Sequence, residues 1–278
     1  MRAHTTVVFC AIDSLITLSN KAVTGFAEFL EALSDKSIPC VWVTARNRLQ
    51  LDTTVRKFGH TAPFIAENGS GVYLPEDYFH LRPAKTLRLG RFTCIPVAKE
   101  QPAARDALNS LAEELEISVV PLRTLSPREL SQNVGLPQRD AELLRQRDFD
   151  ELFFFAGARD ADIEKFRSEA NSRNLALYSQ GALWSLAVVA DLGKCVRELS
   201  KLYDRAIHGH ALTIALGSEE EAAELFPHCN RSLVLKTGSA AHEEVSLEQK
   251  EPGCKSIPLF SPKTWELALE AIQAGRLR

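Results

Sequence analysis

The hydrophobic positions along the chain follow two alternating patterns. Residues 6–12, 40–43 and 63–66 are short apolar runs without alternation, which is typical of strands buried on both faces of a parallel sheet. Between them, residues 22–33 and 49–58 carry apolar side chains three and four positions apart, which predicts helices. Because strand and helix alternate, the sequence predicts a doubly wound α/β sheet.

This alternation stops near Pro83 and resumes after Asp191. The residues between these points predict a separate set of helices and strands, which indicates an inserted module. After Asp191 the sequence predicts a helix at 194–203, a strand at 211–216, a helix at 219–225, a strand at 232–235 and a last helix at 262–275, whereas residues 243–255 are polar and predict a loop. We expect the 6–12 and 211–216 strands to lie side by side. The expected domains are a core domain, residues 1–85 and 187–278, and an inserted α/β cap domain, residues 86–186.

Composition narrows the class of protein. The 278 residues include 33 Lys and Arg against 36 Asp and Glu, so the net charge of -3 excludes a strongly basic nucleic-acid binder. No apolar run reaches the roughly 18 to 20 residues that a membrane-spanning helix needs. The six cysteines are scattered without a C-x-x-C pair, which indicates neither a zinc site nor a disulfide framework. We therefore expect a cytoplasmic protein that contacts neither nucleic acid nor a membrane.

Motifs in both expected domains are recognisable. They are Pro63–Gly69 and Tyr73–Phe79 in the core, and Leu125–Pro127, Gly135–Pro137 and Arg145–Glu151 in the cap. With these motifs the chain resembles the haloacid dehalogenase-like (HAD) phosphatases of the Cof or IIB type, and among them the mannosyl-3-phosphoglycerate phosphatases. The resemblance covers nearly the whole chain. It implies a HAD-like Rossmannoid core, with a doubly wound and mostly parallel sheet, and an inserted α/β cap of the C2B type.

The resemblance also implies a mechanism, and the first motif departs from it. The family uses a nucleophilic Asp, a second Asp two residues later as general acid and base, a Thr or Ser and a Lys that hold the phosphate, and late acidic residues that hold Mg²⁺. Its D-x-D sequence reads Ala11-Ile12-Asp13 here. The acid/base position therefore keeps its carboxylate in Asp13. The nucleophile position holds Ala11, whose methyl group cannot attack phosphorus.

The later motifs of the core are retained in part. The Thr44 hydroxyl and the backbone N–H groups that follow it stand in the phosphate-binding position, with Arg46 close by, although Thr44 is equally compatible with an ordinary helix N-cap. In the third motif Leu192 replaces the phosphate-binding Lys, and Lys194 is the second lysine of the family's pattern. Phosphate or substrate contacts are therefore expected from Thr44, Arg46, Asn68 and Lys194.

The fourth motif has lost the metal-binding acids. Ser218 and Ala222 stand where the family has them, so with Ala11 all three expected metal positions are degenerate. Residues 219–221 are all Glu and are substitute ligands in one interpretation, but acidic residues in a first helical turn are also expected from the helix dipole. We expect no cofactor, with Mg²⁺ only if some activity remains.

In the cap, one motif is intact and one is not. The run from Gln146 to Glu151 is retained, and the resemblance implies that Gln146 and Arg147 touch a sugar-phosphoglycerate. The alternative is a helix-to-strand corner with a buried ion pair. Residues 180–185 keep Gly181 and Trp184 but lack the Arg and the His of the family's pattern.

Three functions remain open. The favoured one is a degenerate and catalytically inactive phosphatase homologue that acts as a subunit of a protein complex or homo-oligomer, or as a regulator that binds a phosphorylated small molecule. The alternative is an active phosphatase on a sugar phosphate or phosphoglycerate derivative, with Asp13 and a relocated metal site. An enzyme that uses Cys10 as nucleophile is disfavoured, because His208 and His210 are expected at the opposite end of the sheet.

Overall fold

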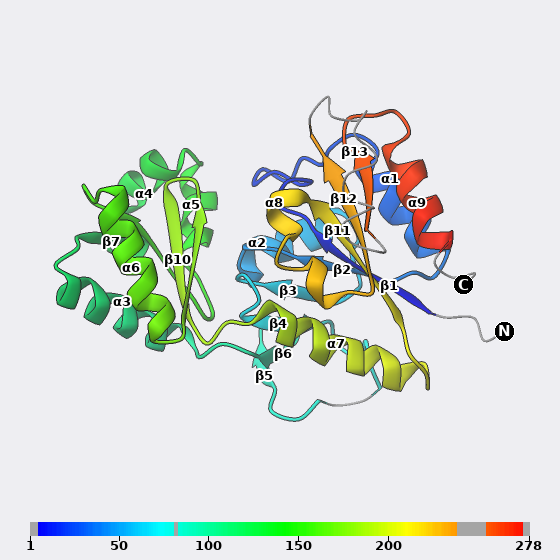
Figure 1. Ribbon diagram of the computed structural model, residues 1–278, viewed down its shortest axis with the longest axis horizontal. Helices are drawn as coiled ribbons and strands as arrows, with labels where there is room; N and C mark the ends of the chain where they lie inside the picture. The colour runs from blue at the N-terminus through cyan, green and yellow to red at the C-terminus, as the bar shows by residue number, and fades with distance from the viewer. Residues whose placement is uncertain (1–4, 81–82, 238–253, 275–278) are drawn as a thin grey trace.

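The computed structural model describes residues 5–80, 83–237 and 254–274, and these form two separate sheets (Figure 1). The first sheet has nine strands in the order β13-β12-β11-β1-β2-β3-β4-β6-β5, and the second has four in the order β7-β8-β10-β9. We call the first sheet with its helices the core and the second with its helices the cap. The expected α/β fold with a mostly parallel central sheet is confirmed.

The strands of the core are β1 (Thr6–Ala11), β2 (Cys40–Val43), β3 (Phe64–Ala66), β4 (Gly71–Leu74), β5 (Leu87–Leu89), β6 (Phe92–Pro96), β11 (Leu212–Ser218), β12 (Arg231–Lys236) and β13 (Cys254–Pro258). Strand β1 is central and pairs in parallel with β11 and β2, with Cys10 opposite both Leu216 and Trp42. The predicted proximity of the first strand and the 211–216 strand is thus confirmed. Strands β4, β5 and β6 pair antiparallel at one edge.

Helices cover both faces of the core sheet. They are α1 (Phe26–Asp35), α2 (Arg48–Lys57), α7 (Leu192–Ala206), α8 (Glu219–Ala222) and α9 (Thr264–Ala274), with the 3-10 turn η2 (Phe226–His228). Val8 and Cys10 on β1 pack toward α1, α2 and α9. Val7 and Phe9 pack toward α7 on the opposite face. Because both faces are covered, β1 is buried at every position and apolar after Thr6, which explains the uninterrupted run in the sequence.

The cap has its own small hydrophobic core. Its elements are α3 (Gln101–Leu115), β7 (Val119–Pro121), the turn η1 (Leu122–Thr124), α4 (Pro127–Val134), α5 (Gln138–Leu144), β8 (Glu151–Phe155), α6 (Asp160–Ser172), β9 (Leu175–Gln180) and β10 (Leu183–Val188). Helices α3 and α6 pack on one face of the sheet through Leu108, Phe153 and Phe166. A second cluster of Leu130, Leu144 and Leu152 joins α4 and α5 to the sheet.

Three sequence predictions need adjustment. Strands β5 and β6 lie beyond residue 86 but pair with the core sheet, so we propose that the inserted cap begins after Pro96. Strand β13 begins at Cys254, within the predicted 243–255 loop, and the rest of that loop lies outside the described residues. Helix α8 has four residues and is shorter than the predicted 219–225 helix. Within the described ranges, no helix is long and apolar enough to cross a membrane.

Candidate functional site

The carboxyl ends of β1 and β2 bring Asp13 and Thr44 together. Strand β1 ends at Ala11, whose methyl group is buried, and Asp13 follows in a turn with its side chain 25% exposed. The Thr44 hydroxyl donates to Asp13 Oδ1 at 2.5 Å, and the Ala45 N–H donates to Asp13 Oδ2 at 2.7 Å. The expected phosphate donors at the end of β2 therefore hold the carboxylate of the chain's own Asp13.

Arg46 completes this group of residues. Its Nε lies 3.1 Å from Asp13 Oδ1, and its Nη2 donates to the carbonyl oxygen of Ile16. The Arg46 side chain is only 6% exposed, and this burial lowers its pKa, whereas the Asp13 carboxylate raises it. We call Asp13, Thr44, Ala45 and Arg46 the Asp13 cluster. Because Arg46 is paired with Asp13, the cluster carries little net charge.

The end of β11 contributes a second carboxylate near Asp13. The Ser218 hydroxyl caps α8 by accepting from the Glu221 N–H at 3.4 Å. Partial burial raises the pKa of the Glu221 carboxyl and the nearby Asp13 carboxylate raises it further, while contacts with Ser14 and Ser218 lower it. Of residues 219–221, Glu221 is thus the one whose pKa the Asp13 carboxylate raises.

These residues do not fit the Mg²⁺ site that the resemblance implies. None of the three expected metal positions carries a carboxylate: positions 11 and 222 are alanines, and Ser218 caps helix α8. The Asp13 oxygens accept from Thr44 and Ala45. In the part of the chain that the structure describes, no three His, Cys, Asp or Glu side chains are grouped so that they could hold a metal ion. Since protein carboxylates anchor Mg²⁺, we derive no step through this ion.

The third motif forms the start of α7 and packs against the turn that follows β3. Asp191 caps the helix by accepting from the Lys194 N–H at 2.7 Å, and the Lys194 side chain is exposed. Leu192 is packed so closely under Gly69 that a Cβ on Gly69 would lie 2.6 Å from the Leu192 backbone. An apolar side chain therefore occupies the position where the family has its phosphate-binding Lys.

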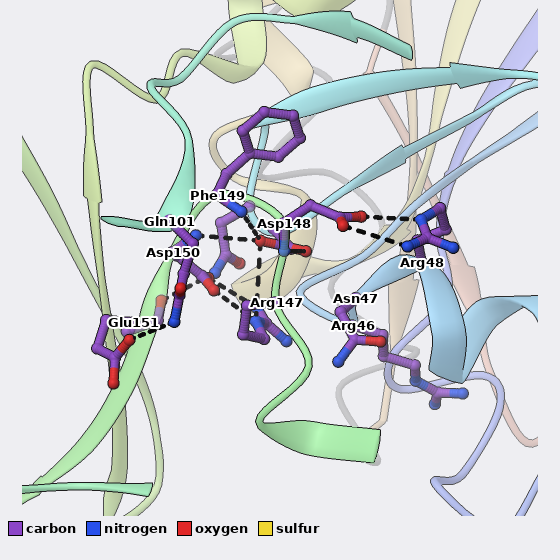
Figure 2. Close-up of polar contacts among 12 residues, drawn as sticks. Arg46, Asn47, Arg48, Gln101, Arg147, Asp148, Phe149, Asp150 and Glu151 are labelled. Carbon is purple, nitrogen blue, oxygen red and sulfur yellow. Dashed lines mark hydrogen bonds and ion pairs between the residues drawn. The ribbon is translucent and has the colours of Figure 1, made fainter. Parts of the chain in front are cut away.

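The intact cap motif forms the joint between cap and core (Figure 2). Arg147 donates to the Asp150 carboxylate through Nε and Nη2, and the Nη2 also donates to the Ala45 carbonyl oxygen at 2.8 Å. Asp148 points the other way, toward Arg48 of α2, whose Nε lies 2.9 Å from Asp148 Oδ2. The Tyr73 hydroxyl donates to the same oxygen at 2.8 Å. The run from Gln146 to Glu151 thus forms a helix-to-strand corner with a buried ion pair, Arg147–Asp150, as the second of the two interpretations of the sequence expected.

Glu67 lies at the centre of this joint and is fully buried. Its carboxyl oxygens accept from the backbone N–H groups of Asp148, Phe149 and Asp150 at 3.0, 2.9 and 3.1 Å. Burial raises the pKa of Glu67 to about 8, the Arg147 charge and the N–H donors oppose this, and Asp150 adds to it. We call Glu67, Arg147, Asp150 and the Asp148–Arg48 pair the core–cap joint.

Two amides fasten the joint further. The Asn47 Nδ2 donates to the carbonyl oxygens of Leu143 and Leu144 at the end of α5. The Asn68 Nδ2 donates to the Ser185 hydroxyl on β10 at 3.2 Å. Asn68 therefore holds the cap, and its predicted contact with a substrate stays a prediction.

A cavity of about 300 Å³ lies beside the Asp13 cluster, between core and cap. Ala45 and Arg46 line it from the core and Arg147 from the cap, while Gln180 and Ala182 lie at its exposed rim. We call it the core–cap cavity. It lies at the carboxyl ends of β1 and β2, where ligands of open α/β sheets bind.

The predicted site residues therefore divide into two groups. Asp13, Thr44 and Arg46 form one cluster, and Arg147 reaches it through Ala45. Gln146 and Lys194 are exposed and line none of the core–cap cavity. The Cys10 thiol is fully buried, which raises its pKa and disfavours the thiolate.

The sequence patterns predicted the backbone N–H groups after Thr44 as donors, and they missed the roles of Glu67 and Asp148 in the core–cap joint. For Glu67 the sequence did contain a signal, because this acidic residue lies within the recognised motif Pro63–Gly69. A Glu at a fully buried position is rare and therefore points to a specific role.

Comparisons with known proteins agree with this architecture. No protein-family model matches the chain. A glucosyl-3-phosphoglycerate/mannosyl-3-phosphoglycerate phosphatase of Methanococcoides burtonii is 26% identical over 212 residues, covering 76% of this chain and 77% of that protein. A phosphatase of the same name from Persephonella marina is 24% identical over 279 residues, covering 97% and 99%.

Solved structures show the same fold. A HAD subclass IIB sugar phosphatase superposes with a TM-score of 0.60 at 12% identity, covering 96% of this chain and 98% of that one. The sucrose-phosphatase of Synechocystis, solved with sucrose and phosphate, superposes with a TM-score of 0.59 at 13% identity, covering 97% and 98%. The chain therefore has the fold of the HAD-like hydrolases, and its resemblance to the mannosyl-3-phosphoglycerate phosphatases is confirmed.

Proposed function

We propose that this protein is a HAD-like phosphatase relative that binds a phosphorylated small molecule between core and cap without hydrolysing it through a phosphoaspartyl intermediate. The observation that carries the proposal is the Asp13 cluster. The hydroxyl of Thr44 and the N–H of Ala45, which are the donors expected for a phosphate, hold a carboxylate at 2.5 and 2.7 Å beside the methyl group of Ala11.

The absence of hydrolysis follows from the chemistry of these positions. Removing a covalent nucleophile from a cooperating set of catalytic residues costs about 10⁶ in turnover in a well-studied protease. Leu192 offers no charge to the transferring phosphoryl group, and the residues at the metal positions do not anchor Mg²⁺. A substitution at one of these positions alone would leave a weak enzyme. Here the nucleophile, the phosphate-binding Lys and the metal-binding acids are all replaced, and all of them serve the same reaction.

The binding half of the proposal follows from the same donors. An N–H and a hydroxyl that hold one carboxylate form a site for an oxyanion, and charge-assisted hydrogen bonds of this kind are the strong ones. A phosphate dianion carries more charge than Asp13 and would also pair with Arg46, which lies 3.1 Å from the present occupant. We infer that a ligand's phosphate replaces the Asp13 carboxylate.

The test is the substitution Asp13→Ala, because a protein that only binds phosphate and an active phosphatase predict opposite results for this variant. If Asp13 competes with the ligand, calorimetry will show that the variant binds 3-phosphoglycerate or inorganic phosphate about ten-fold more tightly than the wild type. Thr44→Val removes one donor and should weaken binding in either background. Asp106→Ala removes an exposed carboxylate of α3 and serves as the matched control. Unchanged or weaker phosphate binding by Asp13→Ala would contradict the proposal.

The second candidate is an active phosphatase. Two observations favour it: the curated relatives are named phosphatases, and the Glu221 carboxyl lies close enough to Asp13 for the Asp13 carboxylate to raise the pKa of Glu221. In that case a Mg²⁺-dependent assay with p-nitrophenyl phosphate would show turnover that Asp13→Ala abolishes. We expect no turnover above the blank in either protein.

A role as a subunit of a homo-oligomer or of a complex with another protein is a separate proposal. It rests on the loss of the catalytic groups together with retention of the whole cap. The mass of the species purified from its own cell tests it. A stoichiometric complex would support it, and a monomer that binds phosphorylated ligands would exclude a subunit role as the main function.

A further inference from the structure

The shape and chemistry of the core–cap cavity indicate the body of the ligand. We propose that the cavity takes a small phosphate monoester whose body is an apolar ring or branched chain and not a sugar. The inference rests on the proposed function, since it places the phosphate group of the ligand in the Asp13 cluster. At about 300 Å³ the cavity is at the small end of ligand pockets, which fits a body of about one ring.

The site expected for the ligand's phosphate lies next to the cavity expected for its body. Ala45 and Arg46 belong both to the Asp13 cluster and to the cavity wall. An anion that replaces the Asp13 carboxylate at the Ala45 N–H therefore directs its substituent toward the cavity. Leu18 lies at the rim on the core side and is 46% exposed, so it leaves apolar surface next to the cavity for a ligand to cover.

The wall opposite the Asp13 cluster is apolar. Nine of the fourteen lining residues carry apolar side chains, so most of a bound body would contact carbon. The largest on the cap side are Leu136, Leu144, Leu152, Phe154 and Leu183. They belong to the cluster that joins α4 and α5 to β8 and β10, and packing within that cluster fixes their positions. An apolar body gains the hydrophobic free energy of leaving water against this wall.

The two arginines of the wall and the side-chain carbonyl oxygen of Gln50 have partners within the protein. Arg46 pairs with Asp13, Arg147 donates to Asp150 and Ala45, and the Gln50 Oε1 accepts from the Asn47 N–H at 3.2 Å. Asn133 and Gln180 lie at the exposed rim. A sugar would bring several hydroxyl groups into this space, and a buried hydroxyl without a partner is costly. The wall therefore discriminates against a polyol.

Two matched esters test this on the full-length protein. Cyclohexylmethyl phosphate and glucose 6-phosphate both carry a phosphate on a CH₂ group beside a six-membered ring, and they differ in the hydroxyl groups and the ring oxygen that only the sugar has. Calorimetry should show that cyclohexylmethyl phosphate binds at least ten-fold more tightly. Leu183→Asn, which puts an amide into the wall, should reduce this preference to three-fold or less. Phe260→Asn changes a residue that is 73% exposed and outside the cavity, so it should leave the preference unchanged.

Further measurements keep the outcome decisive. Val134→Thr changes the half-buried wall with almost no change of shape, and it should lower the preference even if Leu183→Asn does not fold. Glucose 6-phosphate binding as tightly as the apolar ester would overturn this inference and leave the proposed function standing. If neither ester nor inorganic phosphate binds, the proposed function fails and the inference fails with it.

Discussion

Glu67 should make the core–cap joint sensitive to pH. Its carboxyl group is fully buried and accepts three backbone N–H groups from residues 148–150, so it holds the cap motif on the core. Burial raises its pKa to about 8, far above the ordinary value for Glu. Between about pH 4.5 and pH 8 the folded protein then keeps a proton that the unfolded chain has released. The free energy of unfolding therefore falls as pH rises through this window, by at most about 1.4 kcal/mol per pH unit.

The substitution Glu67→Gln separates this effect from others. The carbonyl oxygen of the introduced glutamine can still accept from Phe149 and Asp150, but its NH₂ group would face the Asp148 N–H. Leaving that buried donor without an acceptor costs about 1–3 kcal/mol. The variant should also lose the slope with pH, because glutamine does not titrate. Glu76→Gln breaks an exposed ion pair with Arg88 and should cost at most about 1 kcal/mol.

Urea unfolding between pH 6.5 and pH 8 is the assay. This window lies above the titration of His60, whose pKa burial lowers to about 4, so it isolates Glu67 from that group. A wild type whose stability is constant or rises across the window would show that the N–H donors and Arg147 keep Glu67 ionised, and the reasoning from burial would be refuted. A Glu67→Gln variant as stable as the wild type would show that the joint does not hold the cap.

Three further predictions concern the scaffold. His60 stacks on Trp42 with ring centroids 3.9 Å apart, and its lowered pKa contributes a loss of stability as pH falls from 6.5 toward 4, opposite in sign to the contribution of Glu67. His60→Phe should therefore make the variant gain stability, relative to the wild type, between pH 6.5 and pH 4.5 in urea titrations; an unchanged slope would contradict this. Gly69 has φ +83° and no room for a Cβ against Leu192, whereas Gly157 has φ +69° and open space around it. Gly69→Ala should therefore lower the free energy of unfolding by about 2 kcal/mol more than Gly157→Ala, and equal costs in calorimetric unfolding would refute the close approach of Gly69 to Leu192. Ser126 and Glu129 form a capping box at the N-terminus of α4, so Ser126→Ala should lower the free energy of unfolding by about 1 kcal/mol in the same assay. An unchanged free energy of unfolding would mean that fraying of the first turn of α4 does not destabilise the protein.

The fold was largely predictable because most core strands are buried on both faces. Strands such as β1 and β2 are buried at every position and, apart from Thr6 at the start of β1, carry only apolar side chains, and that pattern is visible in the sequence. The strands at the two edges were missed. Strand β5 reads Leu-Arg-Leu and β13 carries an exposed Lys255, because an edge strand needs apolar side chains on fewer positions. Their pairing depends on contacts that the local sequence does not specify.

The site was predictable by position but not by pairing. The motifs placed Asp13 and Thr44 correctly at neighbouring strand ends, yet the bond between them joins residues 31 positions apart and depends on the register of β1 and β2. Arg46 was expected to be available to an anion and instead pairs with Asp13. For Arg147 the sequence left two interpretations open, and only the fold shows that Asp150 takes its guanidinium group.

The central claim is that the phosphate donors of this protein bind but do not turn over a phosphate ester. Phosphate release from mannosyl-3-phosphoglycerate, the substrate that the relatives' names indicate, tests it most directly when measured with excess Mg²⁺ for the wild type and for Asp13→Asn. We expect no release above the blank from either protein. Steady release by the wild type that Asp13→Asn abolishes would contradict it.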